Sequence, residues 1–162
     1  MENASPLRPT DDAARALAAR LVGEARLAAL ALVDPADGSP HVTRIAFAHD
    51  SEAGYLTLVS DLAAHSRLLR AAPRAALLLG EAPDKGDPLA FPRLSLSATA
   101  QFIDRDSAGH SAARPLWLAR HPKSALYVDF ADFHFVRFTP LSADLNGGFG
   151  KAYRLTPTDL PA

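Results

Sequence analysis

The chain has 162 residues, of which 48% are hydrophobic and 22% are charged, with a formal net charge of -1 and no cysteine. These proportions are typical of a globular protein and predict a single domain over residues 1–162. The absence of cysteine excludes disulfides, thiolate catalysis and cysteine-ligated metals. The net charge of -1 excludes a long nucleic-acid groove, which needs clustered Lys and Arg.

The N-terminal third is predicted to contain one helix and a hairpin of two strands. The first residues, MENASPLRPTDD, lack a signal-peptide pattern, and no apolar run approaches the ~20 residues that span a bilayer, so we expect a cytoplasmic protein without a membrane partner. Thr10, Asp11 and Asp12 are typical of a helix start, and apolar residues then recur at helical spacing. LAALALV and HVTRIAFA flank a turn and predict a hairpin.

The rest of the chain is predicted to be mostly strands, with a short helix before Pro73 and another helix at residues 107–120. The clearest strand signal is RLSLSATAQF, in which apolar and polar residues alternate. Six strands are expected in all, at residues 27–33, 41–48, 55–60, 74–81, 93–103 and 133–146. Because tight turns link most of them, we expect an antiparallel β-barrel with flanking helices. Its core should span about residues 12–155, with residues 156–162 loosely attached.

The short inserted helix has His65, Ser66 and Arg67 in its first turns. A helix start presents free N–H groups and the positive end of the dipole, so a phosphate is stabilised there. A hydroxyl donor and a guanidinium would improve such a site. The alternative is that these are polar residues on a solvated helix face, with Ser60 or Asp61 acting only as a cap, and local chemistry alone favours this alternative.

A family resemblance favours the phosphate interpretation. TRIAF followed by GYLTLVSDLAAHSRLLRAAPRAALLL resembles the flavin-binding core of the pyridoxamine 5'-phosphate oxidase-like family. The resemblance implies a mostly β, six-stranded antiparallel split barrel that binds FMN at the interface of a homodimer. The residues it places at the flavin are Arg44, Ile45, Ala46, Val59, Ser60, His65, Ser66 and Arg67. It implies a flavin-dependent oxidoreductase acting on a small molecule that the sequence does not identify.

The haem-utilisation (HugZ-type) branch of this family gives the fuller match. The resemblance extends over SDLAAHSRLL, DPLAFPRLSLSATAQF, LARHPKSALYVDFADFHFVRF and DLNGGFGKAYRL. It implies haem as the alternative ligand, held by the same barrel. The C-terminal Trp and paired Arg of the oxidase proper and the extra C-terminal domain of haem-degrading members are not matched here. We therefore expect neither pyridoxal phosphate synthesis nor, from this segment alone, haem degradation.

Two further motifs carry no predicted chemistry. GGFGK lacks both nucleotide-loop spacings, so we interpret it as a glycine bend, although the resemblance places Lys151 near the site. The six histidines show no H-x-x-x-H pair, and no metal site is predicted. A haem interpretation requires a ligand such as His134, which we expect to be a sheet-surface residue.

Overall fold

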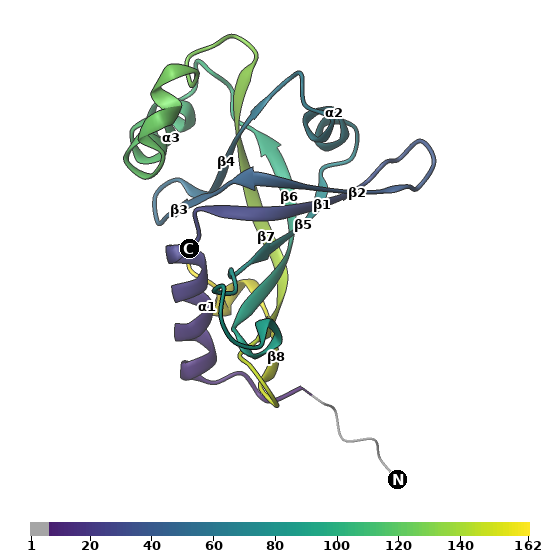
Figure 1. Ribbon diagram of the computed structural model, residues 1–162. Helices are drawn as coiled ribbons and strands as arrows, with labels where there is room; N and C mark the ends of the chain where they lie inside the picture. Colours follow the sequence, from purple (N-terminus) through teal and green to yellow (C-terminus); the bar gives the residue numbers. More distant parts are fainter. Residues whose placement is uncertain (1–6) are drawn as a thin grey trace.

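The computed structural model describes residues 7–162 as an eight-stranded antiparallel sheet with three α-helices around it (Figure 1). The strands are β1 (Leu27–Val33), β2 (Pro40–Ala46), β3 (Ala48–Asp50), β4 (Gly54–Ser60), β5 (Arg74–Leu79), β6 (Arg93–Phe102), β7 (Phe133–Asn146) and β8 (Ala152–Leu155). The helices are α1 (Asp12–Glu24), α2 (Ala64–Ala71) and α3 (Ala108–Arg120). None of the helices in the described part is long and apolar enough to cross a membrane.

The prediction of a mostly β antiparallel fold is confirmed, but the predicted count of six strands is wrong. The strand expected at residues 41–48 divides at Phe47 into β2 and β3, because the chain passes there from one edge of the sheet to the other. The eighth strand, β8, pairs with the end of β7 and was not predicted. It has four residues and follows a glycine bend, so its local sequence pattern is weak.

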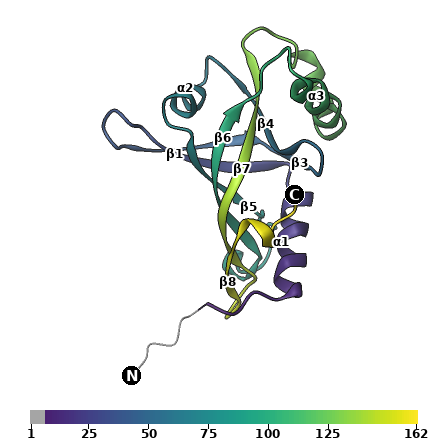
Figure 2. The ribbon, with the colours of Figure 1, turned by 180° about the vertical axis from the view of Figure 1, so that it is seen from behind.

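The sheet curls so that its two edges approach each other, which is consistent with a split barrel. Its strand order is β2-β1-β5-β6-β7-β4-β3, and β1 and β2 run across β5 to β7 (Figure 1). The edge strands β2 and β3 are consecutive in the chain, so Phe47 joins the two ends of the sheet. The Thr57 hydroxyl in β4 donates to the Ala46 carbonyl at 2.7 Å and links the edges further. Seen from behind, β7 spans the length of the sheet (Figure 2).

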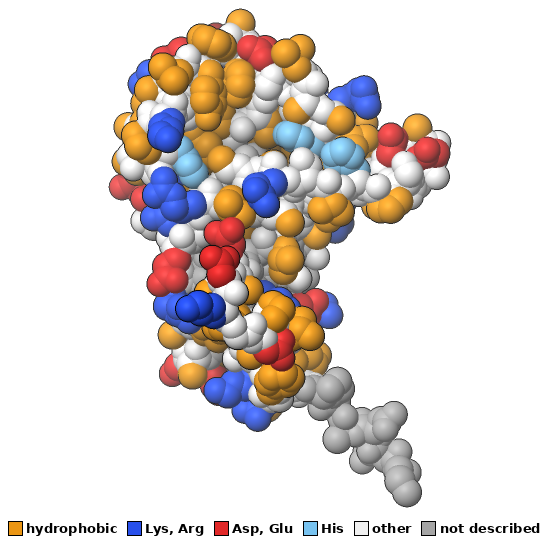
Figure 3. Space-filling model, in the orientation of Figure 1, with side chains coloured by type: hydrophobic (Ala, Val, Ile, Leu, Met, Phe, Trp, Pro, Cys, Tyr) orange, Lys and Arg blue, Asp and Glu red, His pale blue; other side chains and the backbone are white. Residues whose placement is uncertain are grey.

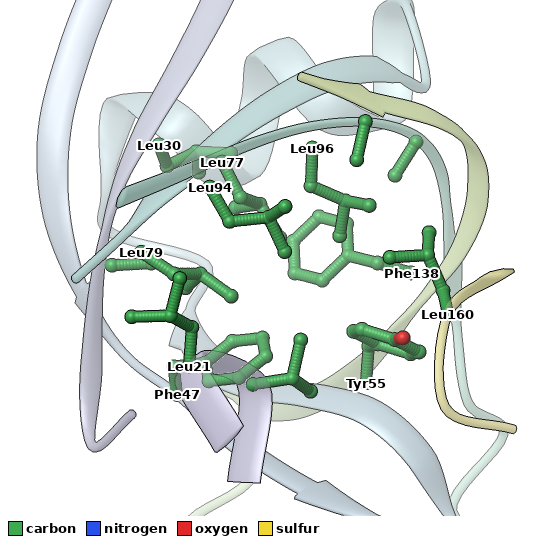
Figure 4. Packing of buried hydrophobic residues seen from close by; sticks show 14 of the residues in the cluster. Leu21, Leu30, Phe47, Tyr55, Leu77, Leu79, Leu94, Leu96, Phe138 and Leu160 are labelled. Atoms are coloured by element: carbon green, nitrogen blue, oxygen red, sulfur yellow. The ribbon is translucent and has the colours of Figure 1, made fainter. Parts of the chain in front are cut away.

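Alternate side chains of each strand fill the interior of the sheet. In β1, Ala28, Leu30 and Leu32 are buried, whereas the residues between them are partly exposed. One hydrophobic cluster fills this interior (Figure 4). Its members include Leu30, Phe47, Tyr55, Leu77, Leu94, Leu96 and Phe138. Burial of apolar surface is the main stabilising contribution to such a core, at roughly 25 cal/mol per Å².

The C-terminal residues belong to this core, and the expectation of a loosely attached tail is wrong. Leu160 is 8% exposed and packs into the cluster (Figure 4). The Tyr55 hydroxyl donates to the Pro161 carbonyl at 2.8 Å, and Asp159 bonds to Arg15 at 2.9 Å. The polar sequence TPTD suggested a free end, but these contacts are made with residues about a hundred or more positions away, which local pattern does not reveal.

The GGFGK segment forms the bend between β7 and β8, as interpreted from the sequence. Gly148 has φ +103°, and a Cβ there would lie 3.0 Å from the carbonyl oxygen of Ala90. The Gly147 N–H donates to the Lys151 carbonyl at 2.7 Å and closes the turn. Glycine is therefore favoured at position 148 by both the backbone conformation and the close packing.

Candidate functional site

The outward face of β1 and β2 carries two adjacent hollows that share Leu27 and Arg44. Their volumes are about 420 and 390 Å³, and both are shallow and open to solvent, the larger one most of all. The strand register places Arg44 opposite Ala29 and Ala46 opposite Leu27, on the face that points away from the core. We call these hollows together the Arg44 groove; its walls are Arg26, Leu27, Ala29, Val42, Thr43, Arg44, Ile45, Ala46, Leu78, Gly80, Glu81 and His121.

Two guanidinium groups give the larger hollow a positive side. Arg44 is exposed and makes no hydrogen bond or ion pair with any residue between 7 and 162. Arg26 donates to the carbonyl of Arg120 at 2.6 Å and is thereby held at the wall of the hollow. In Figure 3 a basic side chain lies over β1 and β2 with apolar side chains beside it. A flat apolar ligand with an anionic group fits this combination of surfaces.

His121 closes one end of the larger hollow. It follows α3, and its Nε2 lies 2.8 Å from the carbonyl oxygen of Phe47. Since a carbonyl only accepts, Nε2 must carry the proton. The ring also lies against Trp117, with centroids 4.3 Å apart. Burial lowers the pKa of His121 despite the bond to Phe47, and the nearby Arg26 and Arg120 lower it further.

The structure places Ser60 and Ser66 in a hydrogen-bonded corner that ties α2 to the end of β4. The Ser66 hydroxyl is buried, with 1% of the residue exposed, and donates to the Ser60 carbonyl at 2.6 Å. The Ser60 hydroxyl donates to Asp132 at 2.6 Å. Val59 is buried in the core. These contacts show a structural use of both hydroxyls; their predicted role in binding a ligand stays a prediction.

His65 and Arg67 lie on the more accessible side of α2. Burial lowers the pKa of His65, and the nearby imidazole of His41 lowers it further. Histidine side chains lie between α2 and β2 in Figure 3. Arg67 is exposed and makes no hydrogen bond or ion pair with a described residue. The predicted phosphate contact of Arg67 therefore has a free guanidinium available, but no hollow of the Arg44 groove reaches it.

The carboxylate of Asp61 links α2 to β7 through contacts with one side chain of each element. It accepts from Arg70 at 2.9 Å and contacts His134 Nε2 at 2.8 Å. The hydrogen bond from Arg70 is the main cause that lowers the pKa of the Asp61 carboxyl, and the hydrogen bond with His134 lowers it further. Arg70 also lies 3.8 Å over the ring of Phe102, a cation–π contact. His134 is thus half-buried and engaged by a carboxylate.

The eight predicted site residues thus fall into two groups. Arg44, Ile45 and Ala46 line one hollow, whereas the five residues of β4 and α2 line neither part of the groove. Sequence reasoning missed Arg26, Leu27 and His121, because the end of α3 meets β1 and β2 only in the folded chain. Within residues 7–162, no group of three or more His, Asp or Glu side chains is placed to hold a metal ion.

Comparison with known proteins gives the family and several relatives. The sequence profile of the pyridoxamine 5'-phosphate oxidase family matches residues 12–146. The chain is 31% identical over 140 residues to haem oxygenase HutZ of Vibrio cholerae, covering 81% of this chain and 74% of HutZ. It is 34% identical over 118 residues to the chloroplast haem oxygenase HOZ of Arabidopsis thaliana, covering 72% of this chain but only 35% of the plant protein.

Solved structures show the same barrel. HutZ, described there as the haem storage protein, has a TM-score of 0.59 at 25% identity, covering 75% of this chain and 85% of HutZ. A haem-binding protein from Mycobacterium smegmatis has a TM-score of 0.82 at 24% identity, covering 96% of this chain and 63% of that chain. At this identity the second likeness is one of fold. The chain therefore belongs to the pyridoxamine 5'-phosphate oxidase-like split-barrel family and resembles the haem-utilisation branch within it.

Proposed function

We propose that this protein binds haem in the Arg44 groove and acts in haem utilisation. The observation that carries the proposal is the 31% identity to HutZ, which runs over 81% of this chain. A second relative, HOZ, is also named a haem oxygenase. The groove is our candidate place for the ligand on the barrel that this chain shares with HutZ.

The groove residues fit the chemistry of haem. Haem is a flat, largely apolar ring with two carboxylates and an iron that takes axial ligands. Leu27 and Ala46 offer apolar contact on the outward face, and Arg44 has no competing partner for a carboxylate among the described residues. His121 adds an imidazole in which one nitrogen is already bonded to a carbonyl.

The residues of the chain would bind and orient the ligand. Arg44 and Arg26 would hold its carboxylates at the positive side of the groove, and the alanines of β1 and β2 let a flat ring approach the sheet closely. Haem, when bound, supplies iron for oxygen chemistry or is simply stored. The groove is open to solvent on the single chain, so a covering surface is needed to keep water from the ring.

A second copy of the chain is our proposal for that covering surface. The outward face of β2, β1 and β5 carries exposed Val42, Val33 and Leu78, at 68%, 56% and 43%. An antiparallel sheet with one solvated face is normally polar on that face, and here it is apolar next to the groove. We therefore propose a homodimer with the ligand site at the interface. Sedimentation velocity should give a dimer, and Val42→Asp should shift it toward monomer.

FMN is the second candidate ligand, and the family match supports it. Arg44, Ile45 and Ala46, which the flavin interpretation names, are among the residues around the larger hollow, with the Ile45 side chain itself turned into the core. The FMN-dependent oxidoreductase stays a prediction, and the phosphate contacts of His65, Ser66 and Arg67 belong to it.

Titration of the purified full-length chain with haem and, in parallel, with FMN separates the candidates. We expect the change in Soret absorption to saturate as haem is added. Arg44→Ala should weaken it by about 1.5–3 kcal/mol, the contribution of a charge-assisted bond, or roughly 10–100-fold. Arg67→Ala is the matched control and should bind haem like the parent. Tight FMN binding that is lost in Arg67→Ala, with no saturable haem binding, would reverse the assignment.

A further inference from the structure

We propose that a hollow at the C-terminal end of α1 binds a free α-amino acid with an apolar side chain. The hollow lies between α1, the start of β1 and the connection from β5 to β6, and its volume is about 340 Å³. We call it the α1 hollow. Its walls are Arg20, Leu21, Glu24, Ala25, Arg26, Leu27, Gly80, Glu81, Phe91 and Pro92. The inference goes beyond the proposed function and does not depend on what occupies the Arg44 groove.

Close packing fixes the apolar walls of the α1 hollow. Gly80 has φ +100°, and a Cβ there would lie 2.6 Å from the Pro92 carbonyl oxygen and 3.3 Å from a methyl carbon of Leu21. The missing side chain at position 80 therefore lets α1 and the start of β6 approach the end of β5 closely. A Cβ at Gly86 would lie 3.4 Å from the ring of Phe91, so the loop supports that ring from behind. An apolar surface is thus in place before a ligand arrives, which lowers the entropy cost of binding.

One cation and one anion in the α1 hollow are left without an ionic partner. Arg20 and Glu24 pair with each other along α1 at 3.5 Å. Arg26 and Glu81 line the same hollow, but no ion pair joins them. Arg26 donates to the carbonyl of Arg120, and its other N–H groups have no acceptor among the described residues. Glu81 is exposed and has no hydrogen-bond partner within residues 7–162.

A ligand with both charges satisfies this arrangement. An α-amino acid carries its ammonium and its carboxylate on neighbouring atoms, so it can offer one group to Glu81 and the other to Arg26. Both contacts are charge-assisted hydrogen bonds. An apolar side chain on the ligand would cover Leu21, Phe91 and Pro92. A ligand with carboxylates alone would meet the negative charge of Glu81, and one with an ammonium alone would meet that of a guanidinium. A concave apolar surface with a few polar groups directed to one place is typical of small-molecule sites.

Titration of the ¹⁵N-labelled full-length chain tests the α1 hollow with three probes. L-phenylalanine carries both charges, phenethylamine lacks the carboxylate and 3-phenylpropionate lacks the ammonium. We expect saturable changes in the amide shifts of Leu21, Gly80 and Phe91 with L-phenylalanine, and weaker binding of the other two probes. Glu81→Gln should weaken L-phenylalanine binding by roughly 2–5-fold, the contribution of an exposed ion pair. Glu52→Gln is the matched control and should bind like the parent, because Glu52 is exposed between β3 and β4 and lines neither the hollow nor the groove.

Three results would overturn the inference. Amide shifts that do not saturate with L-phenylalanine would mean that the hollow binds no amino acid of this kind. Equal affinities for the three probes, or an unchanged affinity in Glu81→Gln, would mean that the two charges are not recognised. Changes confined to Arg44 and Ala46 would place the probe in the Arg44 groove instead. The amide spectrum of each variant without a probe shows whether it is folded, and none of these results depends on haem binding.

Discussion

Replacing Ser66 with Ala removes the bond that ties the first turn of α2 to the end of β4. The hydroxyl is buried and donates to the Ser60 carbonyl at 2.6 Å. That carbonyl also accepts from the Ala63 N–H at 3.0 Å, so it is not left unpaired. We therefore expect the loss of one ordinary hydrogen bond, about 1 kcal/mol, rather than the larger cost of a buried orphan group.

For a chain of this size, about 1 kcal/mol corresponds to a fall in Tm of roughly 2–4 °C. Thermal unfolding followed by circular dichroism measures it, together with urea titration. Ser97→Ala is the matched control, because Ser97 is exposed on β6 and its hydroxyl has no described partner; its change should stay within about 0.5 kcal/mol. Haem affinity should be unchanged in both variants. An unchanged Tm in Ser66→Ala with weakened ligand binding would show that the hydroxyl serves the ligand instead.

Three further variants test the fold. Gly80→Ala should lower stability by about 1–3 kcal/mol or more in urea titration, because Gly80 has φ +100° and a Cβ would lie 2.6 Å from the Pro92 carbonyl oxygen; parent-like stability would contradict that close approach. Leu160→Ala should cost about 2 kcal/mol if the tail belongs to the core, and a change near zero would mean that it does not. The Thr156 backbone N–H, the Thr156 hydroxyl and Arg15 lower the pKa of Asp159 to about 2, below its unfolded value. The ionised Asp159 carboxylate therefore stabilises the fold above about pH 4, and this stabilisation is lost toward pH 2. The Tm difference between the parent and Asp159→Asn should shrink over that range. A constant difference would refute the contact.

The strands were predictable where burial alternates along one segment. In β6, Leu94, Leu96 and Ala98 are buried and the residues between them are not, as the sequence indicated. The division at Phe47 was not predictable, because it depends on the two edges of the sheet meeting. The tail resisted prediction for the same reason, since Leu160 is buried only by distant parts of the chain.

The candidate site was predictable only in part. Arg44, Ile45 and Ala46 are consecutive, so a resemblance at one strand identifies the wall that they form. Arg26 and His121 reach the same hollow from just beyond the ends of α1 and α3, and each looks like an ordinary residue after a helix in the sequence. Long-range packing, which local spacing does not encode, brings them together.

An NMR map of the ligand site tests the central claim most directly. Gallium protoporphyrin, a diamagnetic analogue of haem, would be titrated into the ¹⁵N-labelled full-length protein, and backbone amide shifts would be followed residue by residue. We predict that the largest changes lie at Leu27, Arg44 and Ala46. Changes confined to Ser66 and Arg67, with the amides of β1 and β2 unmoved, would contradict binding in the Arg44 groove.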